Sequence, residues 1–338
     1  MKGNDMSNIG ILGTGTWGTA LGALLHKSGH RITLWSKLPH EIKQLAETRC
    51  HPNLPGMKLA DDILLTTQLS AAIEGMDIVV FAVPSPFVRA TAREAAPYLR
   101  DGQIVVDVAK GIEADTLFTM TEIIEDEIKN PRIKTVALSG PTHAEEVALG
   151  LPTAIVSACE DPACAERVQE VFSCDTLRVY TNDDKRGVEL CGAMKNIIAL
   201  AAGISTGLGY GDNAKAALVT RGIVEITRLG RAMGCSEQTF WGLTGIGDLI
   251  VTATSLHSRN NRCGMLIGGG MKPEEAIEKV GMVVEGVHAL PAAMRLGQTY
   301  HVEMPIAEAV NAVVNGHADP KQTVLALMRR DRKAEQTL

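Results

Sequence analysis

The chain has 338 residues, of which 45% are hydrophobic and 21% charged, and its formal net charge is −6. This length allows two domains that each bury a core, and the acidic balance argues against a general nucleic-acid binder. No signal segment and no apolar run of about 18 residues stands out, so we expect a cytoplasmic protein without a membrane span. Seven cysteines without a C-x-x-C pair predict reduced thiols and no metal site.

The N-terminal region has the pattern of a strand, a glycine turn, a helix and a second strand. An apolar run at residues 8–12 leads into Gly13-Thr14-Gly15-Thr16-Trp17-Gly18. Residues 17–28 have helical spacing and end at Gly29, and a second apolar run occupies residues 31–35. In this order G-x-G-x-x-G predicts a dinucleotide-binding turn rather than a merely structural glycine turn.

Each glycine of this motif has a separate expected task. Gly13 permits the tight turn after the strand, Gly15 lets a pyrophosphate approach the backbone, and Gly18 lets the helix pack against the sheet. We expect the phosphates at the helix N-terminus, where unpaired N–H groups and the helix dipole favour negative charge.

The end of the second strand indicates which dinucleotide is bound. An Asp or Glu there would hold the ribose hydroxyls and repel a 2′-phosphate, but the strand ends Trp35-Ser36-Lys37-Leu38. Ser36 can donate a hydrogen bond and Lys37 can offset phosphate charge, which favours NADP, or use of both NADP and NAD. The alternative is that Lys37 is an ordinary solvated lysine.

Predicted strands continue to alternate with predicted helices up to about residue 187. Further strands are predicted at residues 77–83, 104–108, 135–138, 154–157 and 177–180. From about Val188 the pattern is helical, with long periodic stretches at residues 187–202 and 213–233. We predict an α/β fold, with a Rossmann-type, doubly wound, mostly parallel sheet in a dinucleotide-binding domain at residues 1–187. An all-helical substrate and catalytic domain is expected at residues 188–338, with a ligand cleft at the carboxyl ends of the strands.

Cationic and small residues follow two of the predicted strands. Lys110 comes just after residues 104–108, where it would direct a cation at a bound phosphate, although many loop lysines are merely solvated. The turn Ser139-Gly140-Pro141-Thr142 follows the next strand and allows close approach to the backbone.

The helical half contains a denser set of polar residues. Lys195 and Asn196 interrupt an apolar helix, and a lysine there must be paired or face a cleft, because an unpaired buried ammonium is too costly. Such a lysine is a candidate for proton transfer, although most lysines at a helix edge simply extend to solvent. Asp248 follows a flexible glycine turn, and the forked guanidinium of Arg259 suits a phosphate.

Taken in chain order, these motifs resemble one family. They are the glycine motif with Trp17, Val83-Pro84-Ser85, Ala109-Lys110-Gly111, Ser139-Gly140-Pro141-Thr142, Lys195-Asn196, Gly247-Asp248-Leu249, Ser258-Arg259-Asn260 and Val283-Val284-Glu285-Gly286. The set is similar to that of NAD(P)-dependent glycerol-3-phosphate dehydrogenases of the bacterial type, from Ser7 to about Arg330. The resemblance implies reversible hydride transfer between NAD(P)H and dihydroxyacetone phosphate, giving sn-glycerol 3-phosphate for glycerophospholipid synthesis.

The resemblance also implies roles for individual residues. Lys195 matches the family's proton donor, Asp248 would orient and balance it, and the further participants are Asn196 and Thr252. The positions that match substrate-binding residues are Lys110, Gly140, Thr142, Lys195, Asp248, Ser258, Arg259 and Asn260. Beside the motif glycines Gly13, Gly15 and Gly18, the positions that match cofactor-binding residues are Thr16, Trp17, Lys37, Lys110, Ala144, Arg259, Val283 and Glu285.

Three other interpretations are open at this point. A β-hydroxyacid or ketopantoate-type dehydrogenase shares the glycine motif and a lysine in the helical domain, but its substrate is a carboxylate. A nucleotide sensor would keep the fold without turnover, against which Lys195, Asp248 and Arg259 together argue. A structural oligomerisation module would not need polar residues at so many strand ends.

The long helices of the second half suggest a homodimer interface as a hypothesis.

Overall fold

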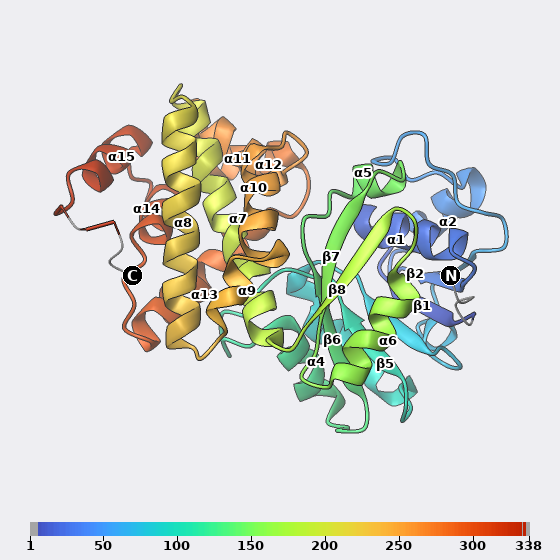
Figure 1. The fold of residues 1–338 in the computed structure, drawn as a ribbon. Helices are drawn as coiled ribbons and strands as arrows, with labels where there is room; N and C mark the ends of the chain where they lie inside the picture. Colours follow the sequence, from blue (N-terminus) through green and yellow to red (C-terminus); the bar gives the residue numbers. More distant parts are fainter. Residues whose placement is uncertain (1–5, 333, 336–338) are drawn as a thin grey trace. The chain divides into compact units, whose positions relative to one another are not determined.

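The structure is a computed structural model that describes residues 6–332, 334 and 335. Its described residues fall into two compact units (Figure 1). The sheet unit holds the residues up to Lys110 together with Phe118–Lys185. The helical unit holds Gly111–Leu117 and the residues from Arg186 onward.

The sheet unit is built on eight strands in the order β3-β2-β1-β4-β5-β6-β7-β8. Their bounds are β1 Asn8–Leu12, β2 Arg31–Trp35, β3 Leu64–Thr66, β4 Ile78–Phe81, β5 Ile104–Asp107, β6 Lys134–Ser139, β7 Thr153–Ala158 and β8 Leu177–Asn182. All neighbouring strands pair in parallel except β6 and β7, which are antiparallel. The predicted doubly wound, mostly parallel sheet is confirmed.

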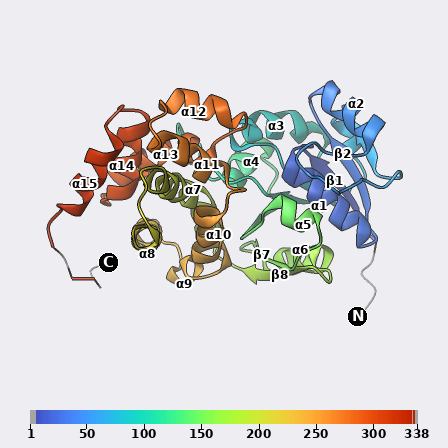
Figure 2. The ribbon, with the colours of Figure 1, turned by 90° about the horizontal axis from the view of Figure 1, so that it is seen from above.

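Helices cover both faces of this sheet (Figures 1 and 2). They are α1 Thr16–Lys27, α2 Pro39–Thr48, α3 Val88–Ala95, α4 Met120–Ile128, α5 Ala144–Ala148 and α6 Pro162–Phe172. Side chains of a strand point alternately to opposite faces, so Ile78 and Val80 pack with residues of α1, α5 and α6. Val79 and Phe81 pack with α3 and α4 instead. Burial on both faces explains why these strands are continuous apolar runs in the sequence.

The helical unit is all-helical, as predicted. Its helices are α7 Lys185–Gly207, α8 Asp212–Ala232, α9 Glu237–Phe240, α10 Asp248–Thr254, α11 Arg259–Gly268, α12 Pro273–Val280, α13 Glu285–Thr299, α14 Pro305–Val314 and α15 Pro320–Met328. By length and composition α7 is able to cross a membrane, but 94% of its apolar window is buried inside the protein. It is therefore the core helix of this unit.

Small residues let α7 pack closely against α11. A Cβ atom added to Gly203 of α7 would lie 2.1 Å from the carbonyl oxygen of Asn261, and one added to Gly264 of α11 would lie 2.2 Å from that of Leu200. Side chains at these positions would force the helices apart. The glycines thereby fix the position of α7, which carries Lys195.

The chain enters the helical unit twice, because Gly111–Leu117 is held there by its own contacts. Ile112 packs in the core of this unit, and the guanidinium of Arg295 in α13 donates hydrogen bonds to the carbonyl oxygens of Ala114 and Asp115. Lys110 ends the preceding part of the sheet unit, at the point where the chain passes from one unit to the other.

Candidate active site

The glycine turn follows β1, as the sequence predicts, and its three glycines differ in their surroundings. Gly13 has φ +127, and an added Cβ would lie 2.7 Å from the backbone of Ala82. A Cβ on Gly18 would lie 2.2 Å from the carbonyl oxygen of Gly13. Gly15 has φ −63, and its added Cβ would meet nothing within 4 Å. The fold requires glycine at Gly13 and Gly18, whereas at Gly15 the open space is suited to a ligand.

The N-terminus of α1 is free to receive an anion. Gly15 is the N-cap residue, no side chain caps the helix, and the first turn carries no acidic residue. Thr16 and Trp17 begin the helix and are half-buried. Unpaired N–H groups and the positive end of the helix dipole therefore face outward beside Gly15, which is the environment that a pyrophosphate needs.

At the end of β2, the two polar side chains that the sequence suggested for contact with a phosphate already have partners within the protein. Lys37 is exposed and forms an ion pair with Glu94 of α3, at 2.5 Å. Ser36 donates its hydroxyl hydrogen to Glu41, at 2.5 Å. Glu41 lies in the first turn of α2 and was not singled out by sequence, because it comes after the strand end. The sequence feature that could have pointed to Glu41 is Pro39, which marks the start of α2 directly after the end of β2. A residue in the first turn of that helix can lie close to the strand end.

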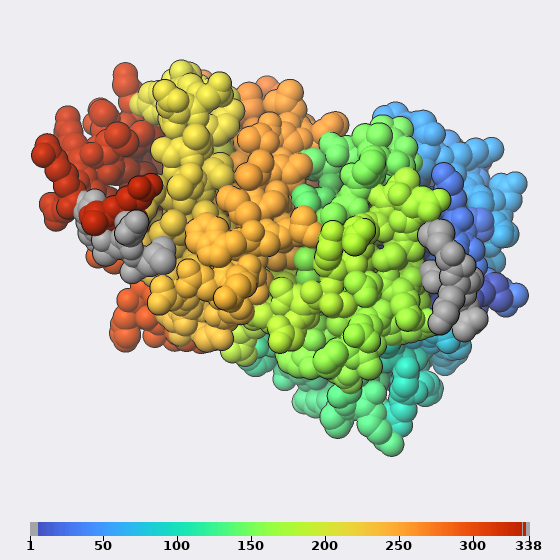
Figure 3. Space-filling view, viewed as in Figure 1, coloured from blue at the N-terminus to red at the C-terminus, as the bar shows by residue number. Residues whose placement is uncertain are grey.

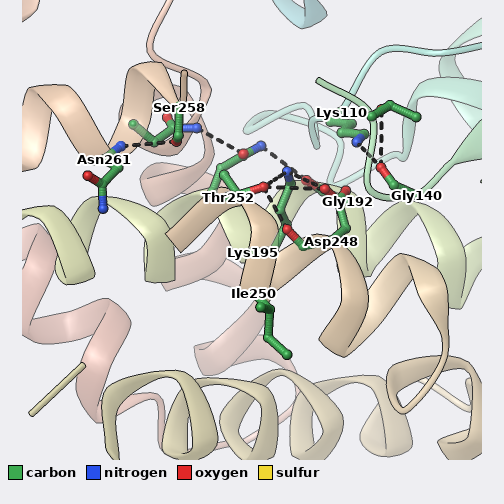
Figure 4. A network of polar contacts seen from close by, with 12 residues as sticks. Lys110, Gly140, Gly192, Lys195, Asp248, Ile250, Thr252, Ser258 and Asn261 are labelled. Atoms are coloured by element: carbon green, nitrogen blue, oxygen red, sulfur yellow. Dashed lines mark hydrogen bonds and ion pairs between the residues drawn. The ribbon is translucent and has the colours of Figure 1, made fainter. Parts of the chain in front are cut away.

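Lys110, Gly140 and Thr142 lie together at the carboxyl ends of β5 and β6, which are neighbouring parallel strands. The Lys110 Nζ donates a hydrogen bond to the carbonyl oxygen of Gly140 at 2.9 Å (Figure 4). The Thr142 hydroxyl donates to the same oxygen at 3.1 Å. Gly140 has φ +150, and an added Cβ would lie 3.0 Å from the Cα of Ile155. Ala144 is buried at the start of α5.

Lys195 is buried and paired, which resolves the problem of an ammonium in an apolar helix. Its side chain is 7% exposed, and its Nζ donates hydrogen bonds to Asp248 Oδ1 at 2.8 Å and Thr252 Oγ1 at 2.5 Å. Figure 4 shows the three side chains pointing toward one another. Breaking such a pair from one side would leave an uncompensated buried charge.

Local structure places the two partners of Lys195 on one face of α10. Asp248 and Thr252 are four residues apart, so they lie one turn apart on the helix, and Thr252 Oγ1 also donates to the Asp248 carbonyl oxygen at 2.6 Å. A π-helical turn at Leu243–Gly247 leads into α10, and such turns are frequent at functional sites. Asp248 is in the first turn of α10, where the helix dipole favours a carboxylate.

A second polar network joins three helices of the helical unit. The Asn260 amide donates to Asn196 Oδ1 at 2.9 Å, and Asn260 Oδ1 accepts from the Gly286 N–H at 2.8 Å. Asn196 in turn donates to the carbonyl oxygen of Gly192, at 3.0 Å. Because Gly286 lies in the first turn of α13, this network connects the helix of Lys195 to the segment that contains Val283 and Glu285.

The N-terminus of α11 carries a cation without an acidic partner. Ser258 caps the helix, since its Oγ accepts from the Asn261 N–H at 3.2 Å. Arg259 follows and is half-buried, and its side chain forms no hydrogen bond or ion pair with any described residue. A guanidinium at the positive end of a helix is unfavourable on its own. An anionic ligand would relieve this arrangement.

Comparisons with known proteins show which family this sequence resembles. The family model described as NAD-dependent glycerol-3-phosphate dehydrogenase N-terminus matches residues 8–165, and the corresponding C-terminus model matches residues 184–325. A glycerol-3-phosphate dehydrogenase [NAD(P)+] 2 of Lactobacillus delbrueckii subsp. bulgaricus is 59% identical over 98% of this chain and 100% of its own. A glycerol-3-phosphate dehydrogenase [NAD(P)+] of Agathobacter rectalis is 50% identical over 98% of each chain.

A solved structure of a protein with the same family name has a closely similar fold. The glycerol-3-phosphate dehydrogenase of Coxiella burnetii superposes with a TM-score of 0.92 at 34% identity, covering 96% of this chain and 99% of its own. The chain belongs to the NAD-dependent glycerol-3-phosphate dehydrogenase family.

Family membership confirms the resemblance seen in the sequence. It covers both the glycine turn and the helices that carry Lys195 and Asp248, and it favours this family over the ketopantoate-type alternative. Within each unit the residues predicted from sequence lie in groups: Lys110 with Gly140 and Thr142, and Lys195 with Asp248 and Thr252.

Proposed function

We propose that this chain catalyses the reversible reduction of dihydroxyacetone phosphate to sn-glycerol 3-phosphate with NADH or NADPH, in the cytoplasm, where the product supplies glycerophospholipid synthesis. The observation that carries the proposal is the buried Lys195–Asp248 pair with Thr252, in a chain 59% identical to a relative named for this activity.

The cofactor site in this proposal is the glycine turn with its uncapped helix. The open space at Gly15 fits a bound pyrophosphate, and a bound nicotinamide dinucleotide supplies the hydride. The other residues proposed to hold it are Gly13, Thr16, Trp17, Gly18, Lys37, Lys110, Ala144, Arg259, Val283 and Glu285. We assign this task mainly to residues 1–187 and catalysis to residues 188–338.

Reduction of a ketone needs a proton at its oxygen as well as a hydride at its carbon. Lys195 would donate that proton and recover it from solvent afterwards. Asp248 accepts a hydrogen bond from the ammonium and Thr252 another, so these two partners hold the Lys195 Nζ in a defined position. Asn196 and Asn260 would position the helix that carries Lys195, through their shared hydrogen bond.

The substrate phosphate requires cationic and N–H groups. Arg259 supports this role because no described residue neutralises it, and its fork can bind two phosphate oxygens. Ser258 and Asn260 flank it at the N-terminus of α11, and the cation at Lys110 with the turn at Gly140 and Thr142 completes the proposed substrate set. Lys195 and Asp248 contact the reacting end.

The homodimer hypothesis is also a proposal. The N-terminal half of α8 reaches the surface (Figure 3), with Ala216, Ala217 and Thr220 exposed. A helix face of small residues suits packing against a second copy of the chain. Sedimentation at several concentrations tests this, and a mass of one chain at all of them would exclude the dimer.

Initial rates of NADH and NADPH oxidation with dihydroxyacetone phosphate test the function. We expect turnover with the wild type and a loss of about 10² to 10⁴ in kcat for Lys195→Ala, the usual contribution of a placed general acid. Lys279→Ala, on α12, removes an exposed lysine outside the proposed site and the proposed dimer face and should keep full activity. Nicotinamide fluorescence should show that Lys195→Ala still binds cofactor.

The opposite result has a defined meaning. If the wild type binds NADPH but does not oxidise it with dihydroxyacetone phosphate, the proposed substrate is wrong. A different 2-oxo substrate or a nucleotide sensor would then be the better interpretation.

A further inference from the structure

A carboxylate lies at the carboxyl end of β2, although no acidic residue follows that strand directly. Oε2 of Glu41, in the first turn of α2, accepts hydrogen bonds from the hydroxyls of Ser36 at 2.5 Å and Thr14 at 2.7 Å. Ser36 follows β2 and Thr14 belongs to the glycine turn after β1, and the two strands are parallel neighbours. In dinucleotide-binding sheets this is the edge where the adenosine ribose is held.

The two hydroxyls are committed to this carboxylate. Thr14 is 3% exposed and Ser36 is 4% exposed, and each hydroxyl has a single hydrogen to donate. Ser36 Oγ also accepts a hydrogen bond from the Leu38 N–H, at 3.1 Å. Neither hydroxyl is therefore available to donate to a phosphate, and together they fix the orientation of Glu41.

Glu41 retains a free acceptor for a ligand. Its side chain is half-buried, and no described residue donates a hydrogen bond to Oε1. The nearby His51 hydrogen-bonds the backbone of Thr14, and burial lowers its pKa despite the opposing effect of Glu41. A lowered pKa disfavours the imidazolium form of His51, which is the form that would offset a neighbouring carboxylate.

Lys37, the cationic residue at the end of β2, forms an ion pair with a different carboxylate, that of Glu94. Lys37 pairs with Glu94 at 2.5 Å, with side chains that are 65% and 45% exposed. A 2′-phosphate would compete with Glu94 for Lys37 and would also approach the charge of Glu41. Exposed pairs of this kind are weak, so Lys37 can still exchange partners.

We propose that Glu41 is a specificity-determining residue for the cofactor, accepting hydrogen bonds from the ribose hydroxyls of NAD(H) and disfavouring the 2′-phosphate of NADP(H). That phosphate carries nearly two negative charges at pH 7. Lys37 acts in the opposite direction, so the balance of these two residues sets the ratio of the two affinities. This inference rests on the cofactor site of the proposed function.

The test compares Glu41→Gln with Glu47→Gln. Gln retains an oxygen that can accept from Thr14 and Ser36 but removes the charge. Glu47 is on the same helix, is exposed, and lies 3.9 Å from Lys43, so its replacement makes the same change in net charge without a contact to the glycine turn. Thermal unfolding verifies that both variants remain folded.

Dissociation constants of NADH and NADPH are measured by nicotinamide fluorescence without substrate. Loss of a solvent-screened like charge should shift the ratio of the two constants about tenfold toward NADPH in Glu41→Gln, and Glu47→Gln should leave it unchanged. The fragments AMP and adenosine 2′,5′-bisphosphate, which differ only in the 2′-phosphate, should show the same shift as competitors of NADH.

Each other outcome contradicts the inference. An unchanged ratio in Glu41→Gln, or an equal shift in Glu47→Gln, would show that Glu41 does not sense the 2′-phosphate. A shift for the dinucleotides that is absent for the two fragments would place the effect elsewhere. If the wild type bound neither dinucleotide, the proposed function itself would fail, and this inference with it.

Discussion

The three glycines of the turn are chemically identical residues, but each has a different physical task. Gly18 is required because a Cβ would lie 2.2 Å from the carbonyl oxygen of Gly13, so its replacement acts on the fold. Gly15 has ordinary backbone angles and open space around it, so its replacement acts on whatever occupies that space. The effects on stability and on binding are therefore separable by residue.

We predict that Gly15→Ala keeps the unfolding temperature of the wild type and weakens NADH binding by at least about tenfold, because the added methyl group occupies the space of the pyrophosphate. Gly18→Ala should lower the free energy of unfolding by roughly 1–3 kcal/mol through overpacking. Calorimetry and fluorescence titration measure the two effects. A strongly destabilised Gly15→Ala would contradict the assignment.

At the scale of elements, a buried carboxylate attaches α14 to α8. Glu225 of α8 is 2% exposed, and its two oxygens accept hydrogen bonds from the N–H groups of Ile306 and Ala307, both at 2.9 Å. These are N–H groups of the first turn of α14, which have no partner within their own helix. Burial raises the pKa of Glu225 to about 7, although these bonds and the nearby Arg228 oppose the shift.

This pKa predicts how stability depends on pH. A carboxyl group whose pKa is higher in the folded than in the unfolded state binds protons preferentially when folded, so its contribution to stability falls as pH rises. The fall begins near the ordinary value of 4.5 and ends above about 7. Between pH 5 and 8 the expected loss is roughly 2–3 kcal/mol.

Urea unfolding of the wild type and of Glu225→Gln at several pH values measures this contribution. Gln does not titrate, so the difference in unfolding free energy between the two proteins should decrease from pH 5 to pH 8 by the amount given above. The lost carboxylate oxygen lowers the stability of the variant at every pH and does not change the slope. Parallel pH profiles would show that Glu225 does not titrate in this range.

At the scale of the whole molecule, each unit has a hydrophobic core of its own. The helical unit buries α7 in one cluster, and the sheet unit has a cluster on each face of its sheet. Most of the residues proposed to bind cofactor are in the sheet unit, although Arg259, Val283 and Glu285 are in the helical unit with Lys195. Because Lys195 itself is not among the proposed cofactor-binding residues, its replacement should leave stabilisation by cofactor intact.

We predict that NADH at about 100 times its dissociation constant stabilises the wild type by roughly 2.7 kcal/mol, and stabilises Lys195→Ala equally. Gly15→Ala, at the same NADH concentration and with at least about tenfold weaker binding, should gain at most roughly half as much. Scanning calorimetry with and without NADH measures the three shifts. A smaller shift in Lys195→Ala would mean that this lysine also contributes to cofactor binding.

Much of the fold followed from local patterns in the sequence. Periodicity and turn residues predicted β1, β2 and α1 closely, because the tight turn at Gly13 and the helix end at Gly29 are encoded by neighbouring residues. The strand β3 was missed because its three residues, Leu64–Thr66, are too few to show a period and none is buried.

The sequence by itself determined the two kinds of architecture, the dinucleotide-binding turn and the family motifs, since these depend on residues close together in the chain. Only the tertiary structure decided that β7 runs antiparallel to β6, that residues 111–117 join the helical unit, and that Glu41 lies at the end of β2. It also brought Lys195 to Asp248, 53 residues away. Such pairings are set by how apolar faces pack, and no local pattern records which distant elements will meet.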